Sequence, residues 1–122
     1  MNPQPRILVV DDDEAVRALM LAVLGEEGYQ VHEAADGNEA LACVGQVAFD
    51  LIIVDWLMPI LDGCTFFDLY RRLPQQHAAV VLCSAVPGAA QKLGGNAPDA
   101  FLLKPFDVGE LCQCVRRCLG LD

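Results

Sequence analysis

The sequence predicts a doubly wound α/β fold, with helices on both faces of a parallel five-stranded sheet. Two observations lead to this fold class. Short apolar runs alternate along the chain with segments whose apolar residues recur at helical spacing. The first, third and fourth runs are apolar on both faces, as strands buried between two helical layers must be. With 122 residues, 54% of them hydrophobic, the chain fits one compact domain, residues 1–122, with a proper core.

The first quarter of the chain contains two expected strands with a helix between them. Arg6 to Val10 is nearly continuous in Ile, Leu and Val, which is typical of a central strand. A helix is expected from Asp13 to Glu27, because its apolar residues share one helical face: Val16, Leu19, Met20, Val23 and Leu24. Gly28 follows where helices commonly end, and Gln30 to Ala34 is a second, weaker strand.

The middle of the chain repeats the alternation of helix and strand, and its strand has a clearer apolar pattern. Residues 36–38, Asp-Gly-Asn, predict a turn, and Glu39 to Val44 a short helix. Asp50 to Val54 is the third strand. Cys64 to Leu73 is a helix that ends before Pro74, since proline cannot continue a helix.

The last part of the chain completes the alternation but contains one weak element. Ala79 to Cys83 and Ala100 to Leu103 are expected strands, and a final helix capped by Asp107 should run to Leu119. Between the two strands, Val86 to Pro98 is rich in glycine and proline. Helix propensity there is poor, so any fourth helix should be short and frayed.

Charge and hydropathy exclude several classes of function. A net charge of −9 argues against direct binding of nucleic acid, which requires clustered Lys and Arg, and suits a cation or a basic partner. No apolar run approaches the ~20 residues of a membrane span. The start of the sequence does not have the form of a secretory signal. We therefore expect a cytoplasmic protein that does not bind a membrane.

Six cysteines raise the question of disulfides or zinc. Cys112, Cys114 and Cys118 lie close together, but a zinc site would need a fourth ligand, and His32 and His77 are distant in sequence. We interpret all six cysteines as reduced thiols that act as small hydrophobes in a cytosolic protein.

Charged and polar residues follow four of the five expected strands. Asp11 to Asp13 follow the first, Asp55 the third, Ser84 the fourth and Lys104 the fifth. In an open parallel sheet, ligands bind beyond the carboxyl ends of the strands. If the first and third strands are neighbours, as in the order 2-1-3-4-5, these side chains meet in one pocket.

This set of groups is suited to phosphoryl transfer. Neighbouring carboxylates repel unless a cation lies among them, and oxygen ligands favour a hard ion such as Mg²⁺. A carboxylate can attack phosphorus and form an acyl phosphate, while Mg²⁺, Lys104 and Ser84 would supply positioning and charge neutralisation. Each residue alone also has an ordinary structural explanation, and Asp13 is expected to cap a helix. The combination at four strand ends favours the functional interpretation.

At these residues the sequence resembles the receiver domain of bacterial two-component response regulators, which has a CheY-like, flavodoxin-like (βα)5 fold. The resemblance covers essentially the whole chain in the same order and at similar spacing. It is carried by four stretches: Ile7 to Glu14, Asp50 to Pro59 with Asp62 and Gly63, Leu82 to Ala85, and Phe101 to Phe106.

The resemblance implies a role for each site residue. Asp55 would accept a phosphoryl group from the phosphohistidine of a sensor histidine kinase or a phosphotransfer protein. Asp11 and Asp12 would hold Mg²⁺, together with Asp55 and the backbone carbonyl of Leu57. Lys104 would pair with the phosphoryl group. The protein would be a phosphorylation-controlled switch that catalyses only its own phosphorylation and dephosphorylation, and not an enzyme with a separate substrate.

The resemblance also implies how the switch is transmitted. Ser84 would bind a phosphoryl oxygen after switching, Phe101 would rotate inward as the aromatic switch residue, and the Lys104-Pro105 bond would be cis. The output face, made by the fourth helix, the fifth strand and the last helix, would then bind a second copy or an effector domain.

Three departures from the family pattern carry hypotheses of their own. Ser84 replaces the commoner threonine but keeps the hydroxyl. Leu57 and Val86 are apolar where relatives often have polar residues that orient water, so we expect slow hydrolysis of the acyl phosphate. The segment Val86 to Pro98 forms either an irregular helix without consequence or an unusual output face.

Other functions stay open at this level. A Mg²⁺-dependent hydrolase acting through an aspartyl phosphate is disfavoured, because the common phosphatases of that kind place a second aspartate where Leu57 stands. A phosphorelay intermediate without its own effector and a purely scaffolding receiver are further alternatives. The receiver domain is expected to be either free-standing or part of a longer regulator or hybrid kinase.

Overall fold

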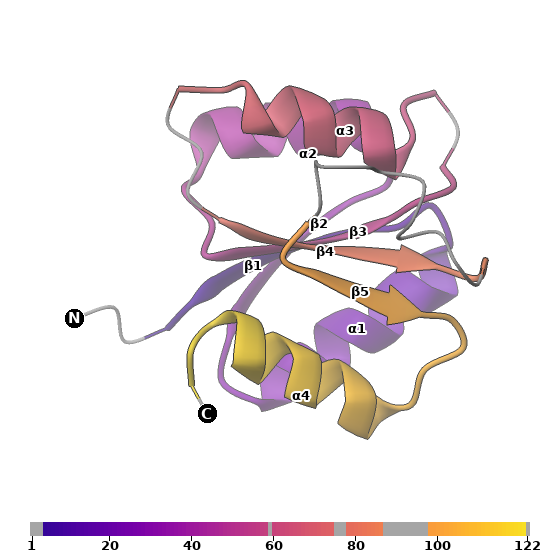
Figure 1. The fold of residues 1–122 in the computed structure, drawn as a ribbon. Coiled ribbons are helices and arrows are strands. Elements are labelled where there is room, and N and C mark those ends of the chain that lie inside the picture. Colours follow the sequence, from indigo (N-terminus) through magenta and orange to yellow (C-terminus); the bar gives the residue numbers. More distant parts are fainter. Residues whose placement is uncertain (1–3, 59, 75–77, 87–97, 122) are drawn as a thin grey trace.

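The computed structural model describes residues 4–58, 60–74, 78–86 and 98–121. Its sheet has five parallel strands in the order β2-β1-β3-β4-β5, which confirms the predicted fold class and order (Figure 1). The strands are β1 (Arg6–Val10), β2 (Gln30–Ala34), β3 (Leu51–Asp55), β4 (Ala79–Ser84) and β5 (Ala100–Leu103).

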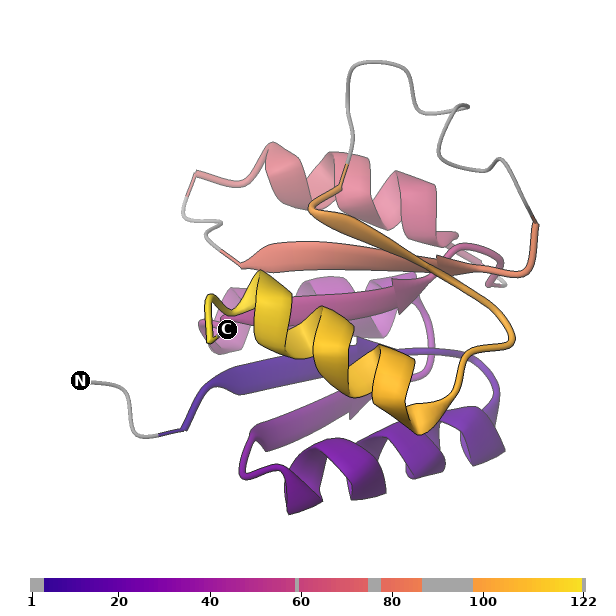
Figure 2. The ribbon, with the colours of Figure 1, turned by 60° about the horizontal axis from the view of Figure 1, so that its bottom comes forward.

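Four helices of the described residues cover the sheet in two layers. They are α1 (Glu14–Glu26), α2 (Gly37–Gln46), α3 (Gly63–Arg71) and α4 (Val108–Cys118). Helices α2 and α3 lie on one face, and α1 and α4 lie on the other (Figures 1 and 2). No helix among the described residues is long and apolar enough to cross a membrane.

The core consists of two apolar layers separated by the sheet. Leu8 of β1 packs with Phe66 of α3 on one face, while its neighbour Ile7 packs with Leu24 of α1 and Leu111 of α4 on the other. Successive strand residues point to opposite faces, so a strand covered on both sides must be apolar throughout. Each large side chain buried in this way stabilises the fold by about 1.5–3 kcal/mol.

The second helix is longer than predicted. It begins at Gly37 and not at Glu39, because the Asp36 carboxylate accepts a hydrogen bond from the Glu39 amide at 2.9 Å and so acts as the N-cap. A Cβ atom at Gly37 would lie 2.7 Å from the Leu61 backbone oxygen. The glycine predicted for a turn therefore lets α2 approach the loop before α3.

Strands β3 and β4 each extend one residue beyond their predicted ends. Asp55 pairs with Cys83, and Ser84 pairs with Leu103, so both polar residues belong to the sheet itself. A short fourth helix was predicted within Val86 to Pro98, and residues 87–97 of that segment lie outside the described part of the chain. The last helix, α4, is confirmed, with Asp107 in a capping box with Glu110.

Candidate functional site

The carboxyl edge of the sheet carries polar side chains at the ends of four strands: Asp55 and Ser84 are the last residues of β3 and β4, and Asp11 and Lys104 directly follow β1 and β5. Val10, the last residue of β1, pairs with Val54, so Asp11 and Asp55 lie at the same level of neighbouring strands. The Lys104 amide donates a hydrogen bond to the Ser84 carbonyl at 2.8 Å, which holds the chain after β5 against the end of β4. The predicted convergence at this edge is confirmed for Asp11, Asp12, Asp55 and Lys104.

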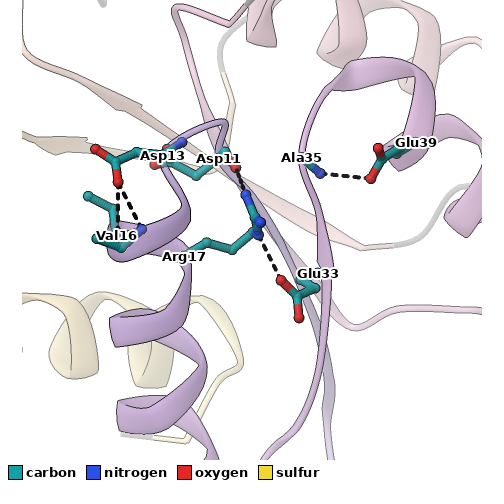
Figure 3. Close-up of polar contacts among 8 residues, drawn as sticks. Asp11, Asp13, Val16, Arg17, Glu33, Ala35 and Glu39 are labelled. Carbon is teal, nitrogen blue, oxygen red and sulfur yellow. Dashed lines mark hydrogen bonds and ion pairs between the residues drawn. The ribbon is translucent and has the colours of Figure 1, made fainter.

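Three carboxylates meet there. One oxygen from each of Asp11, Asp12 and Asp55 lies within 4.8 Å of the others. The side chain of Asp11 is 2% exposed and that of Asp55 is 12% exposed, whereas Asp12 is exposed. Asp13 is separate from this carboxylate cluster: its carboxylate caps α1, accepting from the Ala15 and Val16 amides, as predicted (Figure 3).

Lys104 bridges two of the three acids. Its Nζ lies 3.0 Å from Asp11 Oδ2 and 3.3 Å from Asp55 Oδ1. Burial acts to lower the pKa of Lys104, but the hydrogen bond to Asp11 and the charge of Asp55 outweigh burial and raise it. Lys104 therefore stays a cation beside the cluster. The Lys104-Pro105 bond that follows is cis, as predicted.

One ammonium does not balance three carboxylates. Burial raises the pKa of Asp55 above its ordinary value; Lys104 opposes this shift, and the neighbouring charges of Asp11 and Asp12 add to it. A divalent cation would remove the remaining repulsion. Clustered carboxylate oxygens are the donors that Mg²⁺ prefers, so Asp11, Asp12 and Asp55 fit this ion.

The other predicted site residues, Ser84, Leu57 and Phe101, are not members of the carboxylate cluster. Ser84 is 6% exposed and its Oγ accepts a hydrogen bond from the Val86 amide at 3.0 Å. Leu57 lies two residues after Asp55 with a 66% exposed side chain, and its carbonyl stays a predicted ligand. Phe101 of β5 is half-buried and packs near Trp56, with ring centroids 6.5 Å apart.

A contact that sequence reasoning missed lies behind Asp11. The guanidinium of Arg17 in α1 donates to the Asp11 backbone oxygen and to Glu33 of β2, each at 2.7 Å (Figure 3). The hydrogen bond to Glu33 raises the pKa of Arg17 against the opposing effect of burial. The three residues are separated in sequence, and no local motif in the chain indicates their contact.

The cysteines are all free thiols, as interpreted from the sequence. Burial raises the pKa of Cys64 to about 11 and that of Cys118 to about 11, and burial also raises the pKa of Cys83 beside Asp55. A protonated thiol is a poor nucleophile and a poor metal ligand. A raised pKa therefore disfavours these three thiols as nucleophiles and as metal ligands.

Comparison with known proteins identifies this arrangement. The family model described as the response regulator receiver domain matches residues 7–116. The chain belongs to this family. The receiver domain is 38% identical over 118 residues to the DNA-binding dual master transcriptional regulator RpaA of Synechocystis sp., which covers 94% of this chain and 49% of that protein. It is 35% identical over 111 residues to the transcriptional activator protein PfeR of Pseudomonas aeruginosa, covering 89% of this chain and 36% of PfeR.

Solved structures agree with the family assignment. The receiver domain superposes on the chemotaxis response regulator CheY4 of Vibrio cholerae with a TM-score of 0.88 at 31% identity, covering 95% of this chain and 99% of CheY4. It superposes on TrrA of Thermotoga maritima, solved in complex with Mg²⁺-BeF, with a TM-score of 0.86 at 34% identity, covering 95% of this chain and 100% of TrrA. The chain spans about half, or less, of the length of the curated relatives RpaA and PfeR.

Proposed function

We propose that the receiver domain accepts one phosphoryl group on Asp55 from the phosphohistidine of a histidine kinase or phosphotransfer protein. The observation that carries this proposal is the position of Asp55. It ends a buried central strand, 3.3 Å from the Lys104 ammonium and within the same cluster as Asp11 and Asp12. A carboxylate held at the end of a buried strand, beside a cation, is a preoriented nucleophile.

The transfer itself needs positioning and charge neutralisation from the protein. An Asp55 carboxylate oxygen attacks phosphorus and forms a P–O bond as the P–N bond to the donor histidine breaks. The imidazole leaves with the electron pair of that bond and takes up a proton. Lys104 would pair with the phosphoryl oxygens, which its contact with Asp55 supports, and the Ser84 hydroxyl at the end of β4 would donate to one of them.

Asp11, Asp12 and Asp55, with the backbone carbonyl of Leu57, would hold Mg²⁺. Bound there, the ion would neutralise charge between the acidic cluster and the phosphoryl group. Support comes from the donor set, which is three clustered carboxylates, and from TrrA, whose structure was solved in complex with Mg²⁺-BeF.

The output would follow from Ser84 and Phe101. Phosphorylation adds roughly 1.5 to 2 negative charges, and Ser84 would move toward the new group. Phe101, which lies beside Trp56, would then rotate inward and alter the surface of β5 and α4. We propose that this surface contacts a second copy or an effector domain.

Residues 1–122 would form one receiver domain, either free-standing, a phosphorelay intermediate or part of a longer regulator or hybrid kinase. The six free thiols support a reducing compartment such as the cytoplasm.

Stoichiometry of labelling tests the proposal. With phosphoramidate and Mg²⁺, the parent chain should gain one phosphoryl group by intact mass, and Asp55→Asn should gain none. Asp13→Asn is the matched control, because it removes a neighbouring charge while asparagine still caps α1. Labelling of Asp55→Asn at the parental rate would refute the assignment. Steady turnover of an aryl phosphate would instead indicate a hydrolase.

A further inference from the structure

Arg17 lies outside the carboxylate cluster but contacts its most buried member. It sits one turn into α1, and its side chain is only 14% exposed. Its Nη1 donates to the Asp11 backbone oxygen and its Nε donates to Glu33 Oε1, each at 2.7 Å (Figure 3). One guanidinium therefore connects α1, the end of β1 and β2.

Asp11 is held at four points, and Arg17 supplies one of them. The Asp11 amide donates to the Ala34 carbonyl at 3.2 Å. Its Oδ1 accepts from the Asp13 amide at 2.9 Å, and its Oδ2 accepts from Lys104 at 3.0 Å. The carbonyl lies just past the last residue of β1, and it receives its hydrogen bond from the Arg17 side chain.

The carbonyl of Asp11 belongs to the same peptide unit as the amide of Asp12. Because a peptide unit is planar, fixing that oxygen also fixes where the Cα of Asp12 lies. Asp12 is exposed, so packing does little to orient its carboxylate. The backbone that carries Asp12 is therefore what places it within 4.8 Å of the other two acids.

An arginine suits this position better than a lysine would. Its planar fork presents two donors in fixed directions, so it can satisfy an acceptor just past the end of β1 and another on β2 at once. Glu33 balances the charge and anchors the far side of the fork. A lysine ammonium would keep the charge but could not reproduce both directional contacts.

We propose that Arg17 is a positioning residue for the cation site: it fixes the Asp11–Asp12 peptide and thereby holds the Asp12 carboxylate in place for a divalent cation. This inference rests on the proposed function, because it assigns Arg17 a role in the same site. It makes Arg17 and Glu33 outer parts of the site, although neither belongs to the carboxylate cluster.

The sign of the effect distinguishes positioning from simple electrostatics. Arg17 is a cation beside an acidic cluster, so by charge alone its removal should strengthen binding of Mg²⁺. If Arg17 positions Asp12, its removal should weaken binding instead. Losing a partner that orients a metal ligand typically costs 10–100-fold in metal affinity.

The experiment is a titration of folded variants with Mg²⁺. Binding is monitored by calorimetry and by the fluorescence of Trp56, the only tryptophan in the chain. Arg17→Gln should bind Mg²⁺ at least roughly tenfold more weakly than the parent. Arg72→Gln is the matched control, because it removes an arginine from an exposed ion pair with Asp68 at the far end of α3 and should leave affinity unchanged. Unchanged or tighter binding by Arg17→Gln would overturn the proposal.

Arg17→Lys keeps the inference testable if Arg17→Gln folds poorly. It conserves the charge, so electrostatics predicts no change, whereas positioning predicts weaker Mg²⁺ binding.

Phosphoramidate labelling separates this inference from the proposed function. The variants should reach the parental plateau of one phosphoryl group per chain. The Mg²⁺ concentration that gives a half-maximal labelling rate should be higher than for the parent chain. A parent chain that is never labelled would refute the proposed function, whereas parental Mg²⁺ dependence in both variants would refute only the role of Arg17.

Discussion

Asp55 ends a buried strand in an environment that disfavours its charge. Its pKa lies above the ordinary 3.8, chiefly through burial, so ionisation favours the unfolded chain. The stability that this group contributes is present below its ordinary pKa and is lost as pH rises through its folded-state pKa. Lys104 has its pKa raised from 10.5 and stays charged throughout this range.

Asp55→Asn should therefore stabilise the chain when divalent cations are chelated. At about pH 7 we expect the free energy of unfolding to rise on the order of 1 kcal/mol, and the gain should vanish toward about pH 4. Urea unfolding across this pH range measures both the gain in stability at neutral pH and its loss in acid. Asp13→Asn is the control, because Asp13 caps α1 outside the carboxylate cluster, and it should not raise the free energy of unfolding at about pH 7. An Asp55→Asn effect of equal size at both pH values would contradict ionisation of the buried carboxyl as its cause.

Leu57 follows Asp55 by two residues and Val86 follows Ser84 by two, and the two apolar residues are 66% and 43% exposed. Neither can orient a water molecule toward phosphorus. We therefore expect the acyl phosphate to decay slowly, and Leu57→Asn to speed its hydrolysis by roughly tenfold or more. Loss of label after removal of the donor, in Mg²⁺, measures the rate. Leu73→Asn, which replaces another exposed leucine, at the far end of α3, is the control. A half-life of a few seconds for the acyl phosphate of the parent chain would contradict this hypothesis.

At the scale of elements, the start of α3 depends on a close approach to the end of β3. The Gly63 amide donates to the Trp56 carbonyl at 2.9 Å. A Cβ atom at Gly63 would clash with the Asp55 backbone oxygen and lie 3.0 Å from the Trp56 Cα. The glycine thus lets the helix press directly on the backbone that carries the proposed phosphorylation site.

Gly63→Ala should lower the free energy of unfolding by roughly 1–3 kcal/mol, because the backbone at Asp55 must shift to admit the methyl group. Phosphoramidate labelling should slow as well. In Gly45→Ala, the same change on α2 meets no atom within 4 Å and should raise stability by about 0.5–1 kcal/mol. Urea unfolding of both variants checks the pair. Equal effects would show that helix propensity, and not the close approach, governs Gly63.

At the scale of the whole molecule, the sequence was sufficient wherever local rules determine position. Asp11, Asp55 and Lys104 could be placed together because each follows an apolar strand, and parallel strands end at one edge. Arg17 and Glu33 could not be paired in advance, because their contact depends on how α1 packs across β2. The early start of α2 was missed for a different reason: residues 36–38, Asp-Gly-Asn, also fit a turn, whereas Asp36 in fact caps the helix by accepting from the Glu39 amide.

Repulsion between carboxylates destabilises the molecule at long and at short range, and a titration with cations distinguishes the two contributions. The net charge of −9 is spread over the surface, and any salt screens it. The repulsion among Asp11, Asp12 and Asp55 is local, and what Lys104 leaves of it is relieved more by an ion bound between the carboxylates than by diffuse screening. Mg²⁺ should therefore stabilise the chain by mass action, by about 2.7 kcal/mol at 100 times its dissociation constant, and more than NaCl at equal ionic strength.

Thermal unfolding in MgCl₂ and in NaCl of matched ionic strength measures the difference. Asp12→Asn should lose most of the Mg²⁺ increment yet keep the NaCl response, because it removes one local ligand and only one of many surface charges. Asp36→Asn, which caps α2 outside the cluster, should keep both responses. If NaCl matched MgCl₂ in the parent chain, diffuse screening would account for the stabilisation, and the carboxylate cluster would have no specific affinity for the ion.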